Sequence, residues 1–532
     1  MDLIILSAKL ISIELRNQFG DIPSVMIPFE GKPLLKSQYE FFQIFYNNIY
    51  LILEENFSIV EDYLKVENMP KVKLVSLKDS KSLEDSLISI GKSFTFNQNP
   101  VSILFGDTFF TKIDVKNFNS NFIFVSNVED SSRWTIIKDG LIYDKKILVN
   151  EPPFKAITGF FNFENSSKFF YELENYGFYG SIQKLLLSNK IEVIENTTWI
   201  DLGHEDNLLK TKKNSTRYFN EIKVDFNRGI LTKFSTNTDK FRNEINWYRS
   251  LPKKVSYIAP RILGWNFSKS RSSLDMEYYG YDTLHEKYLY GNFSIQKWET
   301  IFEVLFFSIS ELHKYKKKIS TKKLYKNAYE MYILKPLNRL KKTIEDQTFF
   351  KHLLSSPFVI NKIYVESIHS ILDKVTKLSI KLKIFDISDF SFIHGDFFFS
   401  NILYDFRNDF VRLIDPRGLF GTVRNYGDRR YDYAKLLHSI NGKYNLIIED
   451  KFILKNENNN YSFFITTNLS QNNSLKAFIN VAHRFGLNIS QLKFIEITLF
   501  LSMVTMHSDS LERQKAMLFT GILLLNELEK EI

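Results

Sequence analysis

The chain has 532 residues, and at that length two or three separate hydrophobic cores can form. It contains no cysteine, which excludes disulfide bonds, thiol nucleophiles and cysteine-ligated zinc and suits a reducing cytoplasm. The formal net charge of +9, with 25% charged residues, is basic without being extreme, so the composition does not require a nucleic-acid partner.

The sequence shows no pattern typical of membrane targeting. The first residues are apolar, but Asp2 interrupts them and no basic leader or small-residue cleavage site follows, unlike in a signal peptide. The longest late apolar stretch, residues 494–506, contains Glu496 and is too short to span a bilayer. We therefore expect a cytoplasmic protein without membrane insertion, and the composition does not predict its oligomeric state.

A series of apolar strands with acidic ends runs through the first two hundred residues. Residues 3–8 have a buried-strand pattern, and a segment with prolines and a glycine follows at 22–35. Asp107 follows a later apolar strand, and Asp201 lies in the segment 199–203. Taken alone, each acid is readily explained as the cap of a turn. The order of the pieces resembles that of the sugar-phosphate and choline-phosphate nucleotidyltransferases, which implies an α/β, Rossmann-like (GT-A-like) domain.

The resemblance implies a role for these two acids. Enzymes of that family join an NTP to a phosphorylated alcohol or sugar by attack on the α-phosphate, and two acidic residues hold the magnesium ion. Asp107 and Asp201 would be these metal ligands, with CTP or another NTP as the nucleotide.

The phosphate-binding part of this domain departs from the family. The family's opening loop is rich in glycine and carries an arginine, so that backbone amides and a cation surround the triphosphate. Here residues 9–16 contain no glycine, and Ser24 stands where a lysine is usual. Lys9, Arg16 and Lys32 are the cations that would have to replace them. Two alternatives stay open, an altered but active transferase and a catalytically dead binding domain.

A polar, lysine-rich stretch without apolar periodicity ends this domain. We place a linker at residues 211–217, between a first domain at 1–210 and a second at 218–532. The second domain is expected to divide into a small, β-rich lobe at 218–281 and a larger, mainly helical lobe at 282–532.

The small lobe is predicted from a strand followed by a helix. Lys233 lies inside the apolar strand 229–234, and Glu244 lies on the helix 238–248. This spacing puts the carboxylate beside the ammonium group. An exposed strand lysine and a solvated helix face are the structural alternatives.

The stretch 392–404, followed by 411–418, is the most informative in the chain. Asp396 is followed by Asn401, and Asp415 ends the next apolar strand. Phosphoryl transfer needs one carboxylate to orient and deprotonate the attacking hydroxyl, and an amide with a second carboxylate to hold magnesium on the nucleotide phosphates. A turn with a helix cap is the structural alternative, but a second acid at this distance after a β-rich run rarely arises by accident.

This pattern resembles the choline kinase and aminoglycoside phosphotransferase branch of the protein-kinase-like fold, whose loop reads His-Gly-Asp, four residues, Asn. The resemblance implies a bilobal α+β domain that uses ATP and Mg²⁺. Asp396 would be the catalytic base, and Asn401 and Asp415 the metal ligands. Lys233, positioned by Glu244, would contact the α- and β-phosphates of the nucleotide.

The same resemblance extends to the connection between the lobes. Segment 274–284 is similar to the kinase hinge, where backbone groups around Glu277 and Tyr278 would meet the adenine. The glycine-rich phosphate loop of protein kinases is missing, because residues 219–229 contain a single glycine. Small-molecule kinases of this branch tolerate that departure.

Three arginines and an aspartate follow the proposed metal ligand. Arg417, Arg429 and Arg430 lie near the expected substrate side, where they either grip an anionic substrate or are merely solvated. Asp432, in the first turn of a predicted helix, would by resemblance be a structural brace under the catalytic loop.

Together the two resemblances imply a fusion that phosphorylates a small alcohol and then activates it as a nucleotide conjugate, as in bacterial capsule and surface-polysaccharide biosynthesis. The acceptor would be a sugar or an amino alcohol, which the sequence does not identify. Two competing hypotheses remain: an active kinase with a dead nucleotidyltransferase-like domain, and a scaffold that only binds nucleotides. Retention of Asp396, Asn401 and Asp415 argues against the scaffold.

Overall fold

The computed structural model describes residues 1–54, 58–78, 82–94, 96, 98–113, 118–146, 152–204, 207–208, 222–268 and 271–532. The chain divides into two compact units, Met1–Ser215 and Thr216–Ile532. The predicted linker at 211–217 lies outside the described residues. Each unit has hydrophobic clusters of its own.

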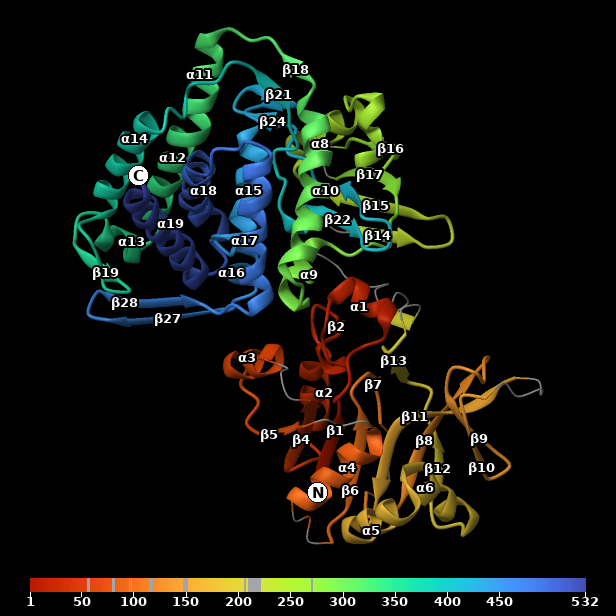
Figure 1. Ribbon diagram of the computed structural model, residues 1–532. Helices are drawn as coiled ribbons and strands as arrows, with labels where there is room; N and C mark the ends of the chain where they lie inside the picture. Colours follow the sequence, from red (N-terminus) through yellow and green to blue (C-terminus); the bar gives the residue numbers. More distant parts are fainter. Residues whose placement is uncertain are drawn as a thin grey trace. The chain divides into compact units, whose positions relative to one another are not determined.

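A mixed sheet of nine strands forms the centre of the first unit (Figure 1). Its order is β10-β9-β11-β6-β1-β4-β5, with β8 paired to β11 and β12 paired to β8. Strand β1 pairs in parallel with both β4 and β6, whereas β11 runs antiparallel to β6. The strands are β1 (Asp2–Leu6), β4 (Asn48–Glu54), β5 (Val72–Leu77), β6 (Val101–Phe105), β8 (Phe122–Val128), β9 (Thr135–Lys138), β10 (Leu141–Asp144), β11 (Phe154–Phe163) and β12 (Glu192–Glu195).

Both faces of this sheet are buried under helices. Leu3 and Ile5 of β1 belong to the hydrophobic cluster that contains α2, and Ile4 belongs to the cluster that contains α4 and α5. A strand buried on both faces has a continuous apolar sequence, which is what residues 3–6 show. The helices of this unit are α1 (Ile13–Phe19), η1 (Ser24–Met26), α2 (Leu34–Phe42), α3 (Ser58–Val66), α4 (Leu83–Ser93), α5 (Ser166–Tyr176) and α6 (Phe178–Leu187).

Short strands outside the main sheet bring the predicted acids together. β7 (Thr108–Phe110) pairs antiparallel with β13 (Trp199–Asp201), and Thr108 lies opposite Asp201. Asp107, which precedes β7, therefore lies next to Asp201. A small hairpin of β2 (Pro28–Phe29) and β3 (Lys32–Pro33) precedes α2.

The second unit begins with an antiparallel sheet of order β14-β15-β17-β16. Lys233 in β15 pairs with Leu274 in β17. Helix α8 (Thr238–Arg249) follows β15 and buries Phe241, Ile245 and Trp247 together with Leu274. The strands are β14 (Ile222–Asp225), β15 (Ile230–Ser235), β16 (Ile262–Asn266) and β17 (Ser272–Glu277).

Helices dominate the rest of the second unit (Figure 1). They are η3 (Lys253–Ile258), α9 (Leu284–Tyr290), α10 (Ile295–His313), α11 (Thr321–Tyr329), η4 (Glu330–Leu334), α12 (Lys335–Asp346), α13 (Thr348–Leu353), α14 (Ile368–Lys381), η5 (Phe399–Asn401), α15 (Arg430–Ile440), α16 (Tyr444–Ile448), α17 (Leu469–Arg484), α18 (Ile489–Met503), η6 (Val504–His507) and α19 (Leu511–Glu531).

Short strands complete this unit. They are β18 (Lys316–Lys317), β19 (Phe358–Ile360), β20 (Ile363–Val365), β21 (Phe390–Phe392), β22 (Ile402–Asp405), β23 (Phe410–Leu413), β24 (Leu419–Phe420), β25 (Val423–Arg424), β26 (Tyr426–Gly427), β27 (Phe452–Glu457) and β28 (Asn460–Ile465). One hydrophobic cluster joins α8 to α10, α15 and the strands of residues 392–418, the predicted catalytic segment, and a second joins α12, α14, α18 and α19. Residues 390–393 contribute to both clusters, so the predicted catalytic segment begins where they meet.

The late apolar run forms α18 and η6, and it is longer than the sequence analysis assumed. Residues Ile489–His507 are, in the described part of the chain, the one helix long and apolar enough to cross a membrane, with a mean hydropathy of 1.4. However, 61% of that window is buried inside the structure, as in the core helix of a globular unit. Glu496 at its centre is fully buried and accepts hydrogen bonds from Asn441 Nδ2 (2.9 Å) and the Gly442 N–H (2.8 Å).

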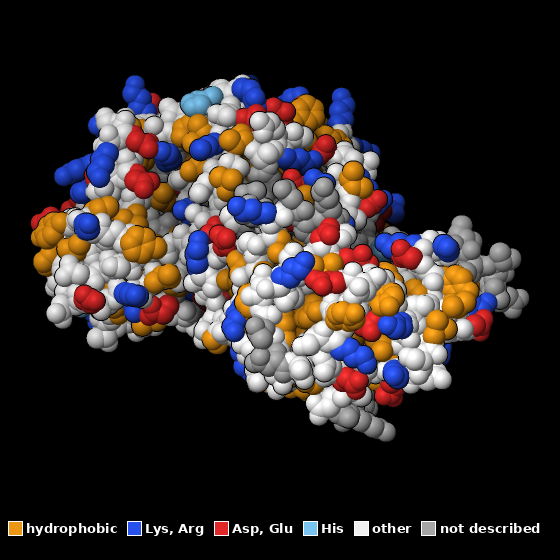
Figure 2. Space-filling model, turned by 60° about the horizontal axis from the view of Figure 1, so that its bottom comes forward, with side chains coloured by type: hydrophobic (Ala, Val, Ile, Leu, Met, Phe, Trp, Pro, Cys, Tyr) orange, Lys and Arg blue, Asp and Glu red, His pale blue; other side chains and the backbone are white. Residues whose placement is uncertain are grey.

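The surface mixes charges of both signs. On the face drawn in Figure 2, lysine and arginine side chains alternate with aspartate and glutamate. The net charge of +9 is therefore not gathered into one basic patch on this face.

Glu496 predicts a pH-dependent stability. Burial raises its pKa from 4.5 to about 8, against the hydrogen bonds from Asn441 and Gly442. A carboxyl whose pKa is raised by folding contributes stability that is complete below pH 4.5 and is lost as the pH rises through about 8. Glu496→Gln removes this titration, so we expect equal stability near pH 4 and, at pH 9, a variant more stable by on the order of a few kcal/mol.

Thermal unfolding of the full chain, followed by calorimetry from pH 4 to pH 9, measures this difference. Glu303→Gln, which removes an exposed carboxylate from α10, is the control and is expected to unfold with the wild-type pH dependence. Identical pH slopes for wild type and Glu496→Gln would show that Glu496 is ionised in the folded protein.

Candidate functional site

One buried carboxylate holds the predicted catalytic loop. Asp432, in the first turn of α15, is fully buried and accepts hydrogen bonds from the backbone N–H groups of His394 (3.0 Å) and Gly395 (2.7 Å). Its Oδ2 also lies 2.9 Å from Nε2 of His313, the last residue of α10. The predicted brace role of Asp432 agrees with these contacts.

The turn that precedes the base depends on a glycine. Gly395 has a φ of +81°, and a Cβ at this position would lie 2.9 Å from Cβ of Arg417. Only glycine combines this conformation with so close an approach. The indole N–H of Trp247, on α8, donates to the Ile393 carbonyl (2.7 Å), so α8 is also attached to the loop.

Asp396 lies at the end of this turn with its carboxylate beside two cations. Its Oδ1 is 3.1 Å from Nζ of Lys435, and a quarter of its side chain (25%) is exposed. Burial acts to raise the pKa of Asp396, but the charges of Lys435 and Arg417 outweigh it and lower the pKa to about 2. The carboxylate is therefore ionised at neutral pH and can accept a hydrogen bond from a hydroxyl.

Asn401 and Asp415 are brought together by a backbone contact. The Ile414 N–H donates to the Asn401 carbonyl (3.0 Å). Nδ2 of Asn401 donates to the Asp396 carbonyl (3.0 Å), which directs the amide oxygen away from the loop backbone. Asp415 has a φ of +56°, a left-handed conformation that aspartate adopts more readily than most residues, and its carboxylate is one-third exposed (33%).

The predicted lysine–glutamate pair is present. Nζ of Lys233 lies 2.8 and 2.9 Å from the two carboxylate oxygens of Glu244 and 2.7 Å from Oδ1 of Asp415. Burial acts to lower the pKa of Lys233, but Asp415 and Glu244 outweigh it and raise the pKa. A charged ammonium is therefore held between the small sheet, α8 and the predicted metal carboxylate.

The predicted hinge residues have their backbone N–H groups occupied. The Tyr278 N–H donates to the Gly229 carbonyl (2.9 Å), and the Glu277 N–H donates to the Arg261 carbonyl (3.0 Å). The Glu277 carboxylate pairs with the Arg261 guanidinium (3.1 Å). Neither N–H group is left for a nucleotide base, so a donor to adenine has to come from a later residue of this segment.

The three arginines differ in their surroundings. Arg430 is held inside the fold by Asp428 (2.7 Å), so it is neither solvated nor free for a substrate. Arg429 is exposed. Arg417 lies against the catalytic loop, where Nη1 donates to the Tyr431 hydroxyl (2.8 Å).

Sequence reasoning missed Lys435. It lies three residues after Asp432, so both side chains share one face of α15. One helix face therefore carries both the brace of the loop and the cation that pairs with the base. The i, i+3 spacing of Asp432 and Lys435 in the sequence could have predicted that both side chains lie at the loop.

In the first unit, Asp107 and Asp201 lie around one point. A Cβ built on Gly203 would be 2.6 Å from Oδ2 of Asp107 and 3.3 Å from Oδ1 of Asp201. Burial, and then the charge of Asp201, raise the pKa of Asp107 to about 6. Two carboxylates this close favour the binding of a cation between them.

Asp201 also has several hydrogen-bond donors that the sequence did not reveal. Oδ2 lies 2.7 Å from His204 Nδ1, 3.0 Å from Asn207 Nδ2 and 3.2 Å from Trp134 Nε1. Oδ1 accepts from the Gly203 N–H (2.9 Å). Donors on both oxygens orient the carboxylate and compete with a metal ion for its lone pairs.

Two of the three predicted phosphate-binding cations are paired with acids. Arg16 lies 2.6 Å from Asp21, and Lys32 pairs with Glu40. Lys9 is exposed in the turn after β1. The structure thus leaves Lys9 as the best placed of the three.

In the described ranges, no group of three or more histidines, aspartates and glutamates is arranged to hold a metal ion. Magnesium is commonly held by one or two side-chain oxygens together with phosphate oxygens of the substrate, and the pairs Asn401–Asp415 and Asp107–Asp201 fit that requirement.

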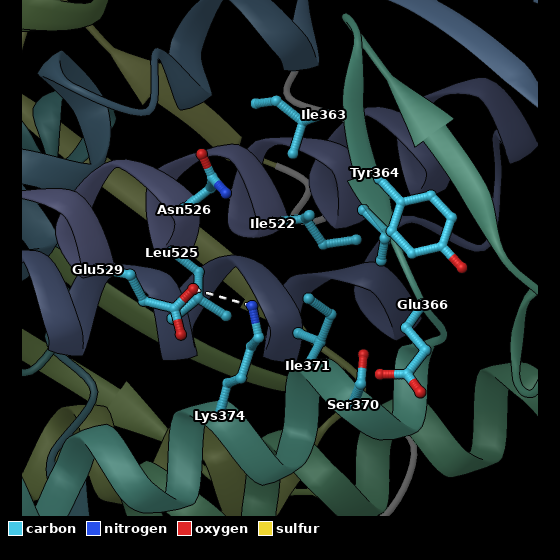
Figure 3. Close-up of a pocket in the computed structure, with 11 residues that line it drawn as sticks. Ile363, Tyr364, Glu366, Ser370, Ile371, Lys374, Ile522, Leu525, Asn526 and Glu529 are labelled. Atoms are coloured by element: carbon cyan, nitrogen blue, oxygen red, sulfur yellow. Dashed lines mark hydrogen bonds and ion pairs between the residues drawn. The ribbon is translucent and has the colours of Figure 1, made fainter.

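A separate pocket in the second unit contains none of the predicted site residues. It lies between α14, α19 and the β19–β20 hairpin, and Figure 3 shows Lys374 and Glu529 joined across it at 3.0 Å. Ile371, Ile522 and Leu525 are among its apolar lining residues. Glu366 also lines the pocket, and none of its lining residues belongs to the predicted sites.

Comparisons with known proteins found matches among solved structures alone. No protein-family model matches the chain, and no curated protein matches it. Similar to the first unit are HddC from Yersinia pseudotuberculosis complexed with GMP-PN (19% identity, 40% of this chain and 97% of that chain, TM-score 0.31) and the inositol-1-phosphate CTP transferase from T. maritima (16%, 41% and 98%, TM-score 0.30).

Similar to the second unit is a thermostable mutant of the aminoglycoside phosphotransferase APH(4)-Ia in a ternary complex with AMP-PNP and hygromycin B (10% identity, 59% of this chain and 92% of that chain, TM-score 0.35). At these identities the similarity concerns the fold alone. The predicted fold class, an α/β unit followed by an α+β unit, is confirmed by the strands and helices of the structure. The chemistry of each unit depends on its side chains.

The contacts of Asp432 predict a large loss of stability on its removal. Asp432→Ala leaves two buried N–H groups and His313 without an acceptor, so we expect the second unit to lose roughly 3 kcal/mol or more. Asp450→Ala removes an exposed carboxylate that pairs with Arg513 and is expected to cost less than about 1 kcal/mol. Urea unfolding of both variants measures the difference, and equal midpoints would contradict the role assigned to Asp432.

Proposed function

We propose that the second unit is an ATP-dependent kinase that phosphorylates a hydroxyl group of a small molecule. The observation that carries the proposal is the contact of Lys233 with both Glu244 and Asp415. A buried ammonium held by one carboxylate of the small lobe and one of the catalytic segment is the arrangement that phosphoryl transfer needs. The hydrogen bond from Nδ2 of Asn401 to the Asp396 carbonyl also supports the kinase proposal, because it leaves the amide oxygen of Asn401 free to bind a metal ion.

Magnesium and ATP are the expected cofactor and donor. Asn401 and Asp415 would hold the ion, which would neutralise the charge of the nucleotide phosphates. Lys233 would bind the α- and β-phosphates in place of its present contact with Asp415.

Asp396 would orient the acceptor hydroxyl. The hydroxyl oxygen forms a bond to the γ-phosphorus while the bond from that phosphorus to the β–γ bridging oxygen breaks, ADP leaves, and the proton passes through Asp396 to solvent. A pKa near 2 makes Asp396 a weak base. Its main contribution is therefore to position the acceptor hydroxyl. It accepts the hydroxyl proton late in the reaction, which suits a loose transition state.

For the first unit we propose nucleotidyl transfer from CTP or another NTP to the phosphorylated product. Asp107 and Asp201 would hold magnesium. The two activities in one chain would supply a nucleotide-activated sugar or amino alcohol for surface-polysaccharide assembly in the cytoplasm.

An alternative for the first unit has specific support. Arg16 and Lys32 are neutralised by Asp21 and Glu40, and both oxygens of Asp201 already accept hydrogen bonds. In the alternative, the first unit only binds a ligand while the kinase is active.

The kinase proposal predicts the effect of Asp396→Asn. The variant keeps the shape of the side chain but cannot accept the proton, so we expect kcat to fall on the order of a hundredfold or more while ATP binding is kept. Asp409→Asn, an exposed aspartate on the following turn, is the control and should keep wild-type turnover. Mass spectrometry of products from a panel of sugars, sugar acids and amino alcohols measures turnover, and full activity of Asp396→Asn would remove the proposed base.

The transferase proposal predicts a second product. With CTP, GTP and UTP present, the phosphorylated acceptor should be converted into a nucleotide conjugate with release of pyrophosphate. Asp107→Asn should abolish this conjugate and leave the kinase product unchanged. If wild type forms no conjugate from a kinase product that accumulates, the binding-domain alternative is correct.

A further inference from the structure

Three basic side chains of the second unit form no ion pair with an acid in the described ranges. Lys335 and Arg339 lie one turn apart on α12, and Arg417 follows the catalytic segment. Arg339 donates to the hydroxyl of Ser502 (2.9 Å), and Arg417 donates to that of Tyr431 (2.8 Å). Across the described ranges none of the three forms an ion pair, whereas the other half-buried arginine of this region, Arg430, does.

These three basic side chains act on one another. Burial, and then the charges of Arg417 and Arg339, lower the pKa of Lys335 to about 6, so its amine is largely neutral at pH 7 without a ligand. Burial and Arg417 also lower the pKa of Arg339. An anion that binds among them offsets the repulsion and favours the protonated form of Lys335.

Asp396 connects this basic cluster to the site of phosphoryl transfer. It is the acidic group among the main charges that act on Lys335, and it is already paired with Lys435. Lys233 interacts instead with Glu244 and Asp415. Arg417 joins the basic cluster to the loop of Asp396, because its N–H donates to the His394 carbonyl (3.0 Å) and a Cβ on Gly395 would lie 2.9 Å from its own Cβ.

The helix that carries Lys335 is distorted where the cluster begins. The π-helical turn η4 leads directly into α12, and Pro336 lies in the first turn of α12. A π turn rotates the side chains that follow it, and such turns are frequent at functional sites. Tyr332 in this turn is anchored by its hydroxyl to Asp428 (2.8 Å), so the distortion is built into the core.

We propose that the acceptor of the kinase carries an anionic group, a phosphate or a carboxylate, which Lys335, Arg339 and Arg417 bind while Asp396 contacts the hydroxyl that is phosphorylated. The proposal rests on the proposed kinase function and narrows its acceptor. Sugar phosphates and sugar acids fit the cluster. Choline and ethanolamine do not, because their positive charge would be repelled by it.

The first test is a titration with inorganic phosphate by calorimetry, in the presence of saturating AMP-PNP and Mg²⁺ so that the donor site is filled. Three proteins are compared: wild type, Lys335→Met/Arg339→Met and Lys341→Met/Lys342→Met, whose lysines are exposed on the same helix. We expect wild type and the exposed-lysine variant to bind phosphate equally, and the first variant to bind it on the order of tenfold or more weakly. If the Lys335→Met/Arg339→Met protein does not fold, the single variant Lys335→Met is used in its place.

Equal phosphate binding by all three proteins, or no binding by wild type, would overturn the proposal. A second arm compares glycerol, glycerol 3-phosphate, glycerate and choline as acceptors, which separates phosphate from carboxylate recognition. We expect turnover of an anionic acceptor, with KM for that acceptor raised in Lys335→Met and KM for ATP unchanged.

The outcomes separate this proposal from the kinase function itself. Preferred turnover of glycerol or choline would leave the kinase established and refute the anionic acceptor. If wild type does not bind AMP-PNP in a magnesium-dependent way, the kinase function fails, whatever the result with phosphate.

Discussion

The catalytic segment of the second unit depends on the burial of one carboxylate. A charge in the interior is stable only when its hydrogen-bonding positions are filled, so the amides of His394 and Gly395 and the ring of His313 converge on Asp432. This convergence attaches α10 and α15 to the loop and sets the turn that ends in Asp396. Lys435, on the same face of α15, then orients the Asp396 carboxylate.

The second unit contains two groups of charged side chains that differ in how far their charges are balanced. Around Lys233 the charges are balanced, since one ammonium is held by Glu244 and Asp415. Around Lys335 they are unbalanced, since Arg417, Arg339 and Lys435 act on it against the single acid Asp396 among its main charges. A balanced cluster keeps its geometry without a ligand, whereas an unbalanced one gains from binding a ligand of opposite charge.

The first unit has an α/β architecture, and the groups of the proposed transferase site in it are incomplete. The short β7–β13 pair brings Asp107 beside Asp201, the two acids to which the resemblance assigned the metal ion. The missing glycine-rich loop would have to be replaced by cations that bind the triphosphate. Arg16 and Lys32 are poorly suited to this role, because each forms an ion pair with a neighbouring acid. The two units thus differ in how completely their side chains match the proposed chemistry.

The sequence by itself determined the fold class and predicted the position of a catalytic loop, because both depend on local information. Apolar runs set the strands of both units, and the spacing of Asp396, Asn401 and Asp415 lies within one short stretch of chain. Partners that are distant in the sequence were decided only by the tertiary structure. Whether Arg16 is free or paired, or which N–H groups of residues 277–278 are available, depends on contacts that no periodicity encodes.

The basic cluster illustrates the same limit. Arg417 was noticed because it follows the loop in the sequence, but Lys335 and Arg339 lie on a basic helix far from it in sequence, and only the tertiary structure brings Lys335 within range of the charges of Arg417 and Asp396. Burial then turns them from solvated lysine and arginine side chains into interacting charges. Sequence patterns predict which residues are charged, and the tertiary structure decides which of those charges remain without a partner, because pairing depends on distance in space.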